Sequence, residues 1–251
     1  PRRQRQMCIR DSFYTMHRNA HGTVSCSRVL QPLNITQFCL SGIDLAMSDF
    51  APVTSVDNLR QHYGVPSRAA STKETPRINA AYRQLLEAAP FFALASIGPE
   101  GLDCSPRGDA ANAVEIIDER TIAIPDRRGN NRLDTLENIV RDGRVALLFL
   151  IPGCDEALRI NGTAIVTVDA DLLASLAKEG REPASAVIVT IQTMYFQCAR
   201  AIRRAGLWDA AMHCDRARLP SAGDLIRSVD PEFDGTVYDN TLADRQSKTL
   251  Y

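Results

Sequence analysis

The sequence predicts a mainly β protein of the α+β class, in which antiparallel strands form a small barrel that carries peripheral helices. From Phe91 onward, apolar strand-like stretches recur with turn signals every ~8–12 residues, which is the spacing of a β-meander. Helical patterns precede, interrupt and follow these strands. No glycine-rich GxGxxG string follows a strand, which argues against a Rossmann fold.

Seven stretches are strand-like, and we expect them to form about six strands. They lie at 91–97, 102–109, 113–117, 121–126, 145–151, 158–168 and 186–197. The run VALLFLI (145–151) is continuously apolar, which favours a strand buried on both faces. Gly162, inside another strand, indicates a β-bulge.

The helical patterns predict five helices, at 57–63, 75–89, 131–141, 169–179 and 198–208. Thr75 is the expected cap of the second, followed by a proline in the first turn. Asn131 is the expected cap of the third, whose inward face is expected to carry Leu133, Leu136, Ile139 and Val140. Asp169 is the expected cap of the fourth.

Composition narrows the class of protein. The chain has 251 residues, of which 45% are hydrophobic and 24% charged, as is ordinary for a soluble globular protein. A net charge of -1 gives no electrostatic reason to expect nucleic acid or an anionic membrane as a partner. No stretch approaches the roughly 18 apolar residues of a membrane span. The seven cysteines form no CxxC pair, so we expect free thiols, a cytoplasmic location and no metal site.

Residues 1–46 differ from the rest of the chain. They contain six arginines, no lysine and only two acidic residues, without helical or strand periodicity. No apolar core follows the basic start, as a signal peptide would require, whereas a transit peptide stays an alternative. The opening RRQRQMCIRDS also resembles translated sequencing-adapter DNA. We therefore expect a non-native or disordered leader over 1–46 and a domain over 47–251 that starts at Met47.

Two polar clusters at strand ends could bind a phosphate. In SPRGD (105–109), the Ser105 hydroxyl and the Arg107 guanidinium stand beside a glycine that lets the backbone approach closely. PDRRGNNR (125–132) offers cations and amides at the start of a helix, where backbone N–H groups favour an anion. The alternative for the first cluster is a polar hairpin exit without a ligand, and the alternative for the second is a solvated loop. Brought together by a barrel, the two clusters could hold one phosphorylated cofactor.

A third cluster lies at 195–208. Arg200, Arg203 and Arg204 share one helical face, and Trp208 could stack on a ring system or fill the core. No Ser/His/Asp or Cys/His arrangement is visible, so the sequence identifies no catalytic side chain. A flavin enzyme needs none, because the cofactor carries out the redox chemistry.

Four segments, taken together, resemble the FMN-binding split barrels related to pyridoxamine 5'-phosphate oxidase. The segments are SPRGD (105–109), IPDRRGNNRLDTLENI (124–139), LLFLIPGCDEALRINGTA (147–164) and CARAIRRAGLW (198–208). The resemblance covers about 47–251. Within the family, the four segments are most similar to a bacterial branch of FMN-dependent enzymes of unknown substrate. It implies a six-stranded antiparallel split β-barrel with peripheral helices, and a homodimer with FMN at the subunit interface.

The resemblance also implies a set of flavin contacts. Arg107 and Ser105 would face the phosphate or the ribityl chain, and Asn131 and Arg132 would bind the phosphate. The isoalloxazine edge would lie beside the backbone of Ile124, Pro125 and Asp126. Further contacts carried over from the family fall on Gln192, Arg200 and Trp208. The chain departs from this branch at two positions. Gln197 stands where the branch has histidine, and Arg200 stands where it has lysine.

The expected function is that of an FMN-dependent oxidoreductase acting on an unidentified small molecule. One alternative is pyridoxamine 5'-phosphate oxidase itself, although the arginine and histidine pair that binds pyridoxal phosphate is not found near the C-terminus. A second alternative is a non-catalytic protein that carries flavin, haem or a deazaflavin on the same barrel. For haem, His213 is the candidate axial ligand.

Overall fold

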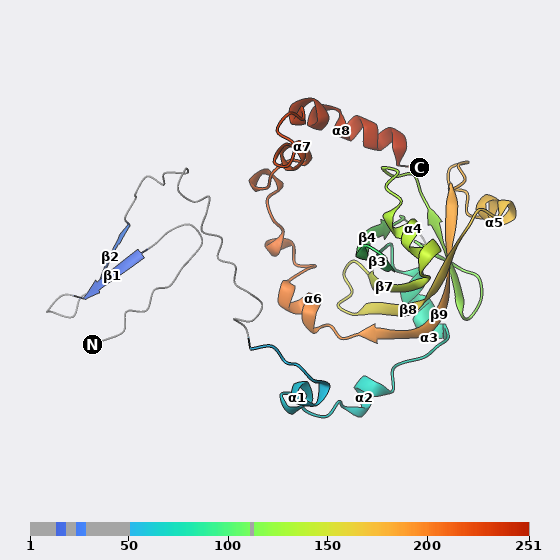
Figure 1. The fold of residues 1–251 in the computed structure, drawn as a ribbon, viewed down its shortest axis with the longest axis horizontal. Coiled ribbons are helices and arrows are strands. Elements are labelled where there is room, and N and C mark those ends of the chain that lie inside the picture. The colour runs from blue at the N-terminus through green and yellow to red at the C-terminus, as the bar shows by residue number, and fades with distance from the viewer. Residues whose placement is uncertain (1–13, 19–23, 29–50, 111–112, 251) are drawn as a thin grey trace. The chain divides into compact units, whose positions relative to one another are not determined.

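The computed structural model describes residues 51–110 and 113–250, together with the backbone of 14–18 and 24–28 (Figure 1). The chain divides into two units, Pro1–Val65 and Pro66–Tyr251. In the first, β1 (Tyr14–Arg18) pairs antiparallel with β2 (Val24–Arg28), a hairpin that the sequence pattern did not predict. Helix α1 (Val56–Gln61) follows, capped by the Ser55 side chain. The rest of the expected leader lies outside the described residues, and so does Met47, the predicted start of the domain.

The second unit is built on one antiparallel sheet of seven strands in the order β4-β3-β7-β8-β9-β6-β5 (Figure 1). The strands are β3 (Phe91–Gly98), β4 (Gly101–Gly108), β5 (Glu115–Ile116), β6 (Thr121–Asp126), β7 (Arg144–Leu150), β8 (Ala157–Thr167) and β9 (Ser185–Gln197). The predicted class, antiparallel strands with peripheral helices, is confirmed. The strand number is seven rather than six, because the two-residue β5 pairs with β6 at the sheet edge.

Short helices surround the sheet. They are α2 (Arg68–Ser71), α3 (Ala80–Glu87), α4 (Asp134–Arg141), α5 (Ala170–Ser175), α6 (Arg200–Ala205), α7 (Ala222–Arg227) and α8 (Gly235–Thr249). Two 3₁₀ turns, Ala210–Met212 and Arg216–Arg218, separate α6 from α7. Across the described stretches, every helix is too short or too polar to cross a bilayer.

The main hydrophobic core lies where α3 and α4 meet strands β3, β6, β7, β8 and β9. On β3, Phe92 and Leu94 alternate with half-exposed neighbours and are both fully buried. The Phe92 ring stacks on that of Phe149 in β7, with 4.7 Å between the ring centroids. Strand β7 is not buried on both faces as predicted: Leu148 is 40% exposed, because only alternate side chains of β7 point into the core.

Strands β8 and β9 form the longest pairing, and the predicted bulge occurs within it. The register shifts between Asn161 and Gly162. A Cβ atom on Gly162 would lie 2.2 Å from the Thr190 carbonyl oxygen. This separation is too short for any side chain. Glycine is therefore required at this point because the bulge brings the two backbones together.

Helix α4 begins later than the sequence predicts. Asn131 does not cap it, because this residue has the left-handed φ of 60° and turns the chain before the helix starts at Asp134. The cap thus moves two residues along the chain, to Leu133. Ile139 is buried and Leu136 packs against the core, as predicted. Leu133 and Val140, predicted inward, are 48% and 75% exposed, whereas Thr135 and Asn138 are buried against the sheet.

The other helix caps gave mixed outcomes. Asp169 caps α5, accepting a hydrogen bond from the Leu172 backbone N–H at 3.0 Å, as predicted. Thr75 does not cap α3. It pairs instead with Met194 in an isolated β-bridge, and Asn79 caps the helix.

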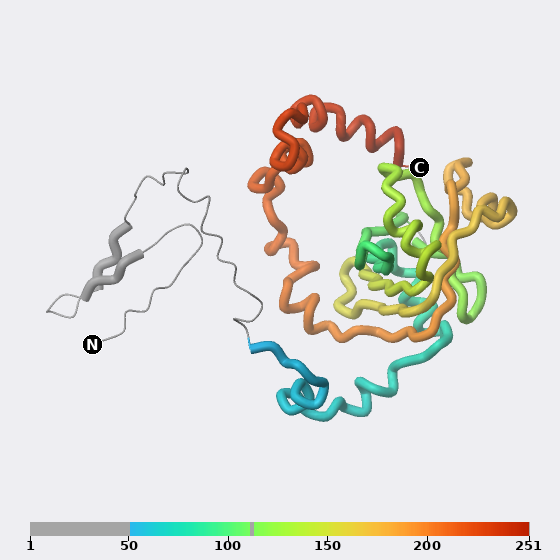
Figure 2. Tube along the Cα trace, viewed as in Figure 1, coloured from blue at the N-terminus to red at the C-terminus, as the bar shows by residue number. Residues whose placement is uncertain are grey.

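The segment after β9 leaves the sheet (Figure 2). Helices α7 and α8 pack closely where Gly223 faces Gly235, since a Cβ atom on Gly223 would lie 2.2 Å from the Gly235 carbonyl oxygen. Near the end of α8, Lys248 comes back to the loop that joins β6 to α4. The C-terminal helix therefore contributes a residue to the site described next.

Candidate anion-binding site

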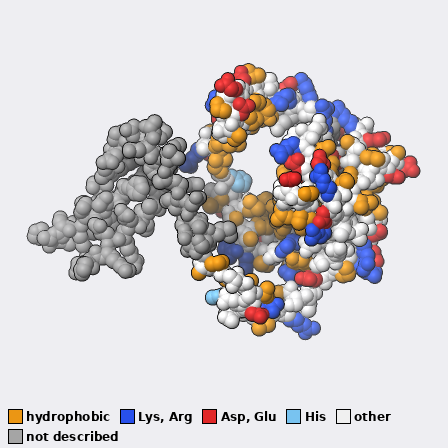
Figure 3. Space-filling model, in the orientation of Figure 1, with side chains coloured by type: hydrophobic (Ala, Val, Ile, Leu, Met, Phe, Trp, Pro, Cys, Tyr) orange, Lys and Arg blue, Asp and Glu red, His pale blue; other side chains and the backbone are white. Residues whose placement is uncertain are grey.

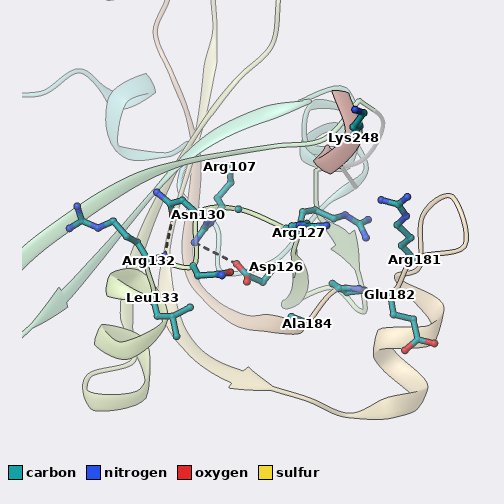
Figure 4. Close-up of a pocket in the computed structure, with 14 residues that line it drawn as sticks. Arg107, Asp126, Arg127, Asn130, Arg132, Leu133, Arg181, Glu182, Ala184 and Lys248 are labelled. Atoms are coloured by element: carbon teal, nitrogen blue, oxygen red, sulfur yellow. Dashed lines mark hydrogen bonds and ion pairs between the residues drawn. The ribbon is translucent and has the colours of Figure 1, made fainter. Parts of the chain in front are cut away.

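A cavity of about 510 Å³ lies where the end of β4, the β6–α4 loop and the segment before β9 meet (Figure 4). Its volume is within the range of pockets that enclose one cofactor-sized molecule. The residues that line it are Arg107, Asp126, Arg127, Arg128, Gly129, Asn130, Asn131, Arg132, Leu133, Arg181, Glu182, Pro183, Ala184 and Lys248. Arginine and lysine predominate, and side chains of both charges gather around α4 and the end of α8 (Figure 3). The cavity is therefore suited to an anion.

Arg107 and Arg132 reach the cavity from elements far apart in the sequence. Arg107 is on the half-buried side of β4, and its Nη2 lies 3.8 Å from Oδ1 of Asp126. Arg132 is held from its own loop: its backbone N–H donates to Oδ1 of Asn130 at 3.1 Å, and its Nη2 lies 2.5 Å from Oδ2 of Asp134. The structure thus brings together two of the arginines that the sequence singled out.

Asp126 stands between the cations of this cavity. Its side chain is 20% exposed. Burial raises the pKa of its carboxyl group above the usual value, and the nearby Arg107 guanidinium opposes the shift. A carboxylate held here weakens the attraction for a bound anion, and its partial neutralisation by Arg107 limits that effect.

A second cavity of about 240 Å³ adjoins the first and shares Arg107, Arg127, Arg128 and Gly129 with it. Its wall is partly apolar, formed by Ala113, Ile124 and Pro125, all of them buried. Strand β6 supplies Ile124 and Pro125 of this wall and the acidic Asp126 of the neighbouring cavity. An apolar surface next to a cationic pocket fits a ligand that has a flat ring at one end and an anion at the other.

A group of buried ion pairs centred on Asp109 joins the two polar segments predicted to bind a phosphate, 105–109 and 125–132. The Asp109 side chain, 3% exposed, accepts a hydrogen bond from Nε of Arg127 at 3.1 Å and also pairs with Nζ of Lys178. Arg127 additionally donates to the Leu176 carbonyl oxygen at 2.8 Å. One carboxylate at the end of β4 thereby fixes the end of β6 and the residues after α5.

Four of the residues predicted to contact a cofactor do not line either cavity. The Ser105 hydroxyl is 2.9 Å from that of Thr135 and helps to dock α4 on the sheet. Gln192 and Arg200 are exposed on β9 and α6. Trp208 is half-buried, with Nε1 donating to the Cys154 carbonyl oxygen at 2.7 Å. Of the remaining predicted residues, Arg107, Asp126, Asn131 and Arg132 line the larger cavity, and Arg107, Ile124 and Pro125 line the smaller one.

Sequence reasoning missed several cavity residues. Arg127 and Arg128 stood in a cluster already noted as cationic, so a signal for them was present. Arg181 and Lys248 gave none, because they lie in segments distant from both clusters and only the fold brings them to the cavity. Within the described ranges, His, Cys, Asp and Glu nowhere form a group of three or more that could hold a metal ion.

Comparison with protein families matches residues 78–198 to the family described as pyridoxamine 5'-phosphate oxidase. The matched region runs from just before α3 to the end of β9 and therefore includes the entire sheet and both phosphate-type clusters. Residues 78–198 belong to the pyridoxamine 5'-phosphate oxidase-like family. The cavity thus lies within the part that defines this family, except for Lys248, which comes from the C-terminal helix.

Solved structures of low sequence identity resemble about half of the chain. HupZ of Group A Streptococcus is 15% identical over 48% of this chain and 94% of its own, with a TM-score of 0.41. A proposed pyridoxamine 5'-phosphate oxidase from Lactobacillus delbrueckii is 20% identical over 49% and 99%, with a TM-score of 0.40. An FMN-binding protein from Syntrophomonas wolfei is 12% identical over 45% and 86%, with a TM-score of 0.35. No curated protein sequence matches the chain.

Proposed function

We propose that the two adjoining cavities bind FMN. The observation that carries the proposal is that Arg107 of β4 and Arg132 of the β6–α4 loop line one cavity, beside the apolar wall of Ile124 and Pro125. Two guanidinium groups suit a dianionic phosphate, because each can donate two parallel hydrogen bonds to its oxygens. The buried apolar wall suits an isoalloxazine ring. Membership of the pyridoxamine 5'-phosphate oxidase-like family supports the same assignment.

The residues of the chain would divide the work of holding this cofactor. Arg107, Asn131 and Arg132 would hold the phosphate, and the backbone of Ile124, Pro125 and Asp126 would border the ring. Burial of that backbone would keep water from one face of the ring. When bound, FMN supplies the redox chemistry itself, accepting or donating electrons at its ring.

We further propose that the protein is an FMN-dependent oxidoreductase acting on a small molecule. Among the described residues, those that line the larger cavity include no histidine, cysteine, serine or tyrosine. This composition does not favour nucleophilic catalysis and leaves the chemistry to the cofactor. The same composition also favours a second candidate function, that of a non-catalytic flavin carrier.

Binding of FMN is tested by the visible absorption spectrum of the purified protein and by mass spectrometry of the ligand it releases. The variants Arg107→Ala and Arg132→Ala should each bind FMN at least about tenfold more weakly, since a hydrogen bond to a charged group contributes roughly 1.5–3 kcal/mol. The affinity for riboflavin, which lacks the phosphate, should differ far less between these variants and the wild type. Arg141→Ala is the matched control, because Arg141 is exposed on α4, lines neither cavity and pairs with Glu137. A protein that stays colourless with excess FMN contradicts the proposal.

The two candidate functions differ in what happens to the bound flavin. An oxidoreductase should be bleached by a reductant such as NADH, NADPH or pyridoxamine 5'-phosphate, and should regain its colour in oxygen over repeated cycles. A carrier should stay oxidised with all three compounds. Formation of pyridoxal 5'-phosphate would instead assign the narrower oxidase activity.

We also propose that the protein is a homodimer. Apolar side chains are exposed on the sheet and along the C-terminal segment (Figure 3), among them Ile165 at 64%, Leu225 at 56% and Val229 at 86%. Such surfaces suit a self-complementary interface. Gln192, Arg200 and Trp208 lie outside the cavities of their own chain, and we propose that they contact the FMN of the partner.

Light scattering at micromolar concentration tests the dimer. A dimer mass is expected for the wild type and a shift towards monomer, with loss of flavin, for Ile165→Asp. A sharp monomer mass in a protein that retains flavin contradicts an interface-bound cofactor.

We also propose a cytoplasmic location. The described cysteines, Cys104, Cys154, Cys198 and Cys214, are free thiols, which supports this proposal.

A further inference from the structure

Arg128 differs from the other arginines of the smaller cavity. It is exposed in the β6–α4 loop and lines both the larger and the smaller cavity. Across the residues that the structure describes, its side chain makes no hydrogen bond, ion pair or ring contact. Its guanidinium is therefore available to a ligand that enters either cavity.

The other two arginines of the smaller cavity are held by carboxylates of their own chain. Nη2 of Arg107 lies 3.8 Å from Oδ1 of Asp126. Nε of Arg127 donates to Oδ2 of Asp109 at 3.1 Å. A carboxylate partner offsets part of the positive charge of each of these two arginines. Arg128 adds a positive charge that no such partner offsets.

This charge lies beside the apolar wall of the smaller cavity. Ile124 and Pro125, which form part of that wall, are buried. Electrostatic interactions are screened less beside apolar groups that keep water away. A flat ring placed against the wall would also cover part of the Arg128 side chain and exclude water from it. The arginine would then act most strongly on negative charge that develops on the ring itself.

We propose that Arg128 tunes the bound flavin by stabilising the negative charge that its ring acquires on reduction. The inference rests on the proposed binding of FMN, with the ring in the smaller cavity. A hydride donor such as NADH gives the ring two electrons and one proton and is itself oxidised to NAD. The oxidised ring is uncharged and the reduced ring is an anion at neutral pH, so Arg128 favours the reduced state. A charge beside the ring is one of the means by which proteins tune a flavin.

Sulfite tests the inference on the FMN-loaded protein without turnover. The sulfur lone pair forms a bond to N5 of the ring, no group leaves, and the ring gains the negative charge. The adduct loses the visible absorption of the oxidised flavin, so a titration gives its Kd. Arg128→Gln should bind sulfite at least about tenfold more weakly than the wild type, because the charge that stabilises the adduct is gone. Its affinity for FMN should stay close to that of the wild type.

The reduction potential is the second measurement. Sulfite is itself an anion, so a direct attraction to Arg128 has to be separated from an effect on the ring. The midpoint potential of the bound flavin, measured against a dye of known potential, involves no added anion. A tenfold change in a two-electron equilibrium corresponds to about 30 mV, so Arg128→Gln should lower the potential by about 30 mV or more.

Three further variants sharpen the test. Arg128→Lys keeps the charge and should retain most of both effects. Arg128→Glu reverses the charge, should shift both quantities beyond Arg128→Gln, and serves if that variant fails to fold. Arg120→Gln is the matched control and should behave as the wild type does. Arg120 is also exposed, precedes β6 where Arg128 follows it, lines neither cavity, and has a side chain without a partner among the described residues.

The affinity for FMN, measured first in each variant, separates the possible failures. Arg128→Gln that binds FMN normally and keeps the wild-type potential overturns the inference and leaves FMN binding intact, whatever its affinity for sulfite. Loss of FMN affinity in Arg128→Gln to the extent seen in Arg107→Ala would also overturn it, because Arg128 would then bind the phosphate. A wild type that binds no FMN overturns the proposed function, and the inference with it.

Discussion

Arg107 and Asp126 face each other from strands that are not neighbours in the sheet, with Nη2 3.8 Å from Oδ1. Both side chains are largely shielded, at 28% and 20% exposure. The carboxylate is the nearest acidic group to an arginine that we assign to a phosphate. Asp126 therefore competes with that phosphate for the same guanidinium, and its protonation state should affect both stability and binding.

Replacement of Asp126 by asparagine should change the pH dependence of stability. Because burial raises the pKa of Asp126 in the folded protein, its contribution to stability is present below the unfolded value and is lost as the pH rises through the folded value. The unfolding midpoint of Asp126→Asn should thus gain on that of the wild type as the pH rises from acid to neutral. FMN should also bind the variant more tightly at neutral pH. A midpoint difference that falls with rising pH would refute this account.

The Asp109 cluster should be a large contributor to stability. Asp109→Asn leaves Arg127 and Lys178, which are 19% and 26% exposed, without their shared carboxylate. Removing one partner of a buried ion pair lowers the free energy of unfolding by roughly 3–5 kcal/mol. Because the two cations are partly exposed, we expect a loss of about 3 kcal/mol. Urea unfolding measures the change. The control Glu87→Gln removes an exposed helical pair with Arg83 and should cost no more than about 0.5 kcal/mol.

The bulge in β8 predicts opposite effects of the same substitution at two glycines. Gly162→Ala forces a methyl group against the Thr190 carbonyl oxygen and should destabilise the fold by roughly 1–3 kcal/mol. At Gly129 a Cβ atom meets nothing within 4 Å, so Gly129→Ala should be neutral or stabilising by up to about 1 kcal/mol. Equal effects of the two substitutions in chemical denaturation would show that the bulge tolerates a side chain.

Cys198 should be the most reactive of the exposed thiols in the described part of the chain. A hydrogen bond from the Arg200 backbone, and then the Arg200 charge, lower the pKa of Cys198 below the usual value for a thiol. A larger thiolate fraction at neutral pH speeds alkylation. Iodoacetamide labelling followed by peptide mass spectrometry should therefore modify Cys198 before Cys214, which is also exposed. Preferential labelling of Cys214 would be inconsistent with this assignment.

The sequence by itself determined those features that depend on neighbouring residues. Apolar stretches separated by turn signals specified the strands, an acidic cap specified the start of α5 at Asp169, and a glycine within a strand specified the bulge at Gly162. Each is local, because a strand period, a cap and a bulge need only a few consecutive residues. The same local chemistry marked Arg107 and Arg132 as candidates for binding an anion.

Only the tertiary structure decided which of these residues meet. Arg181 and Lys248 reach the cavity because the sheet order and the return of α8 bring distant segments together, and no periodicity records such a contact. The start of α4 also depended on the fold: docking of Thr135 against Ser105 and the left-handed Asn131 prevailed over the capping preference of asparagine. Long-range packing energies exceed local propensities, so they set the exact residues of the site.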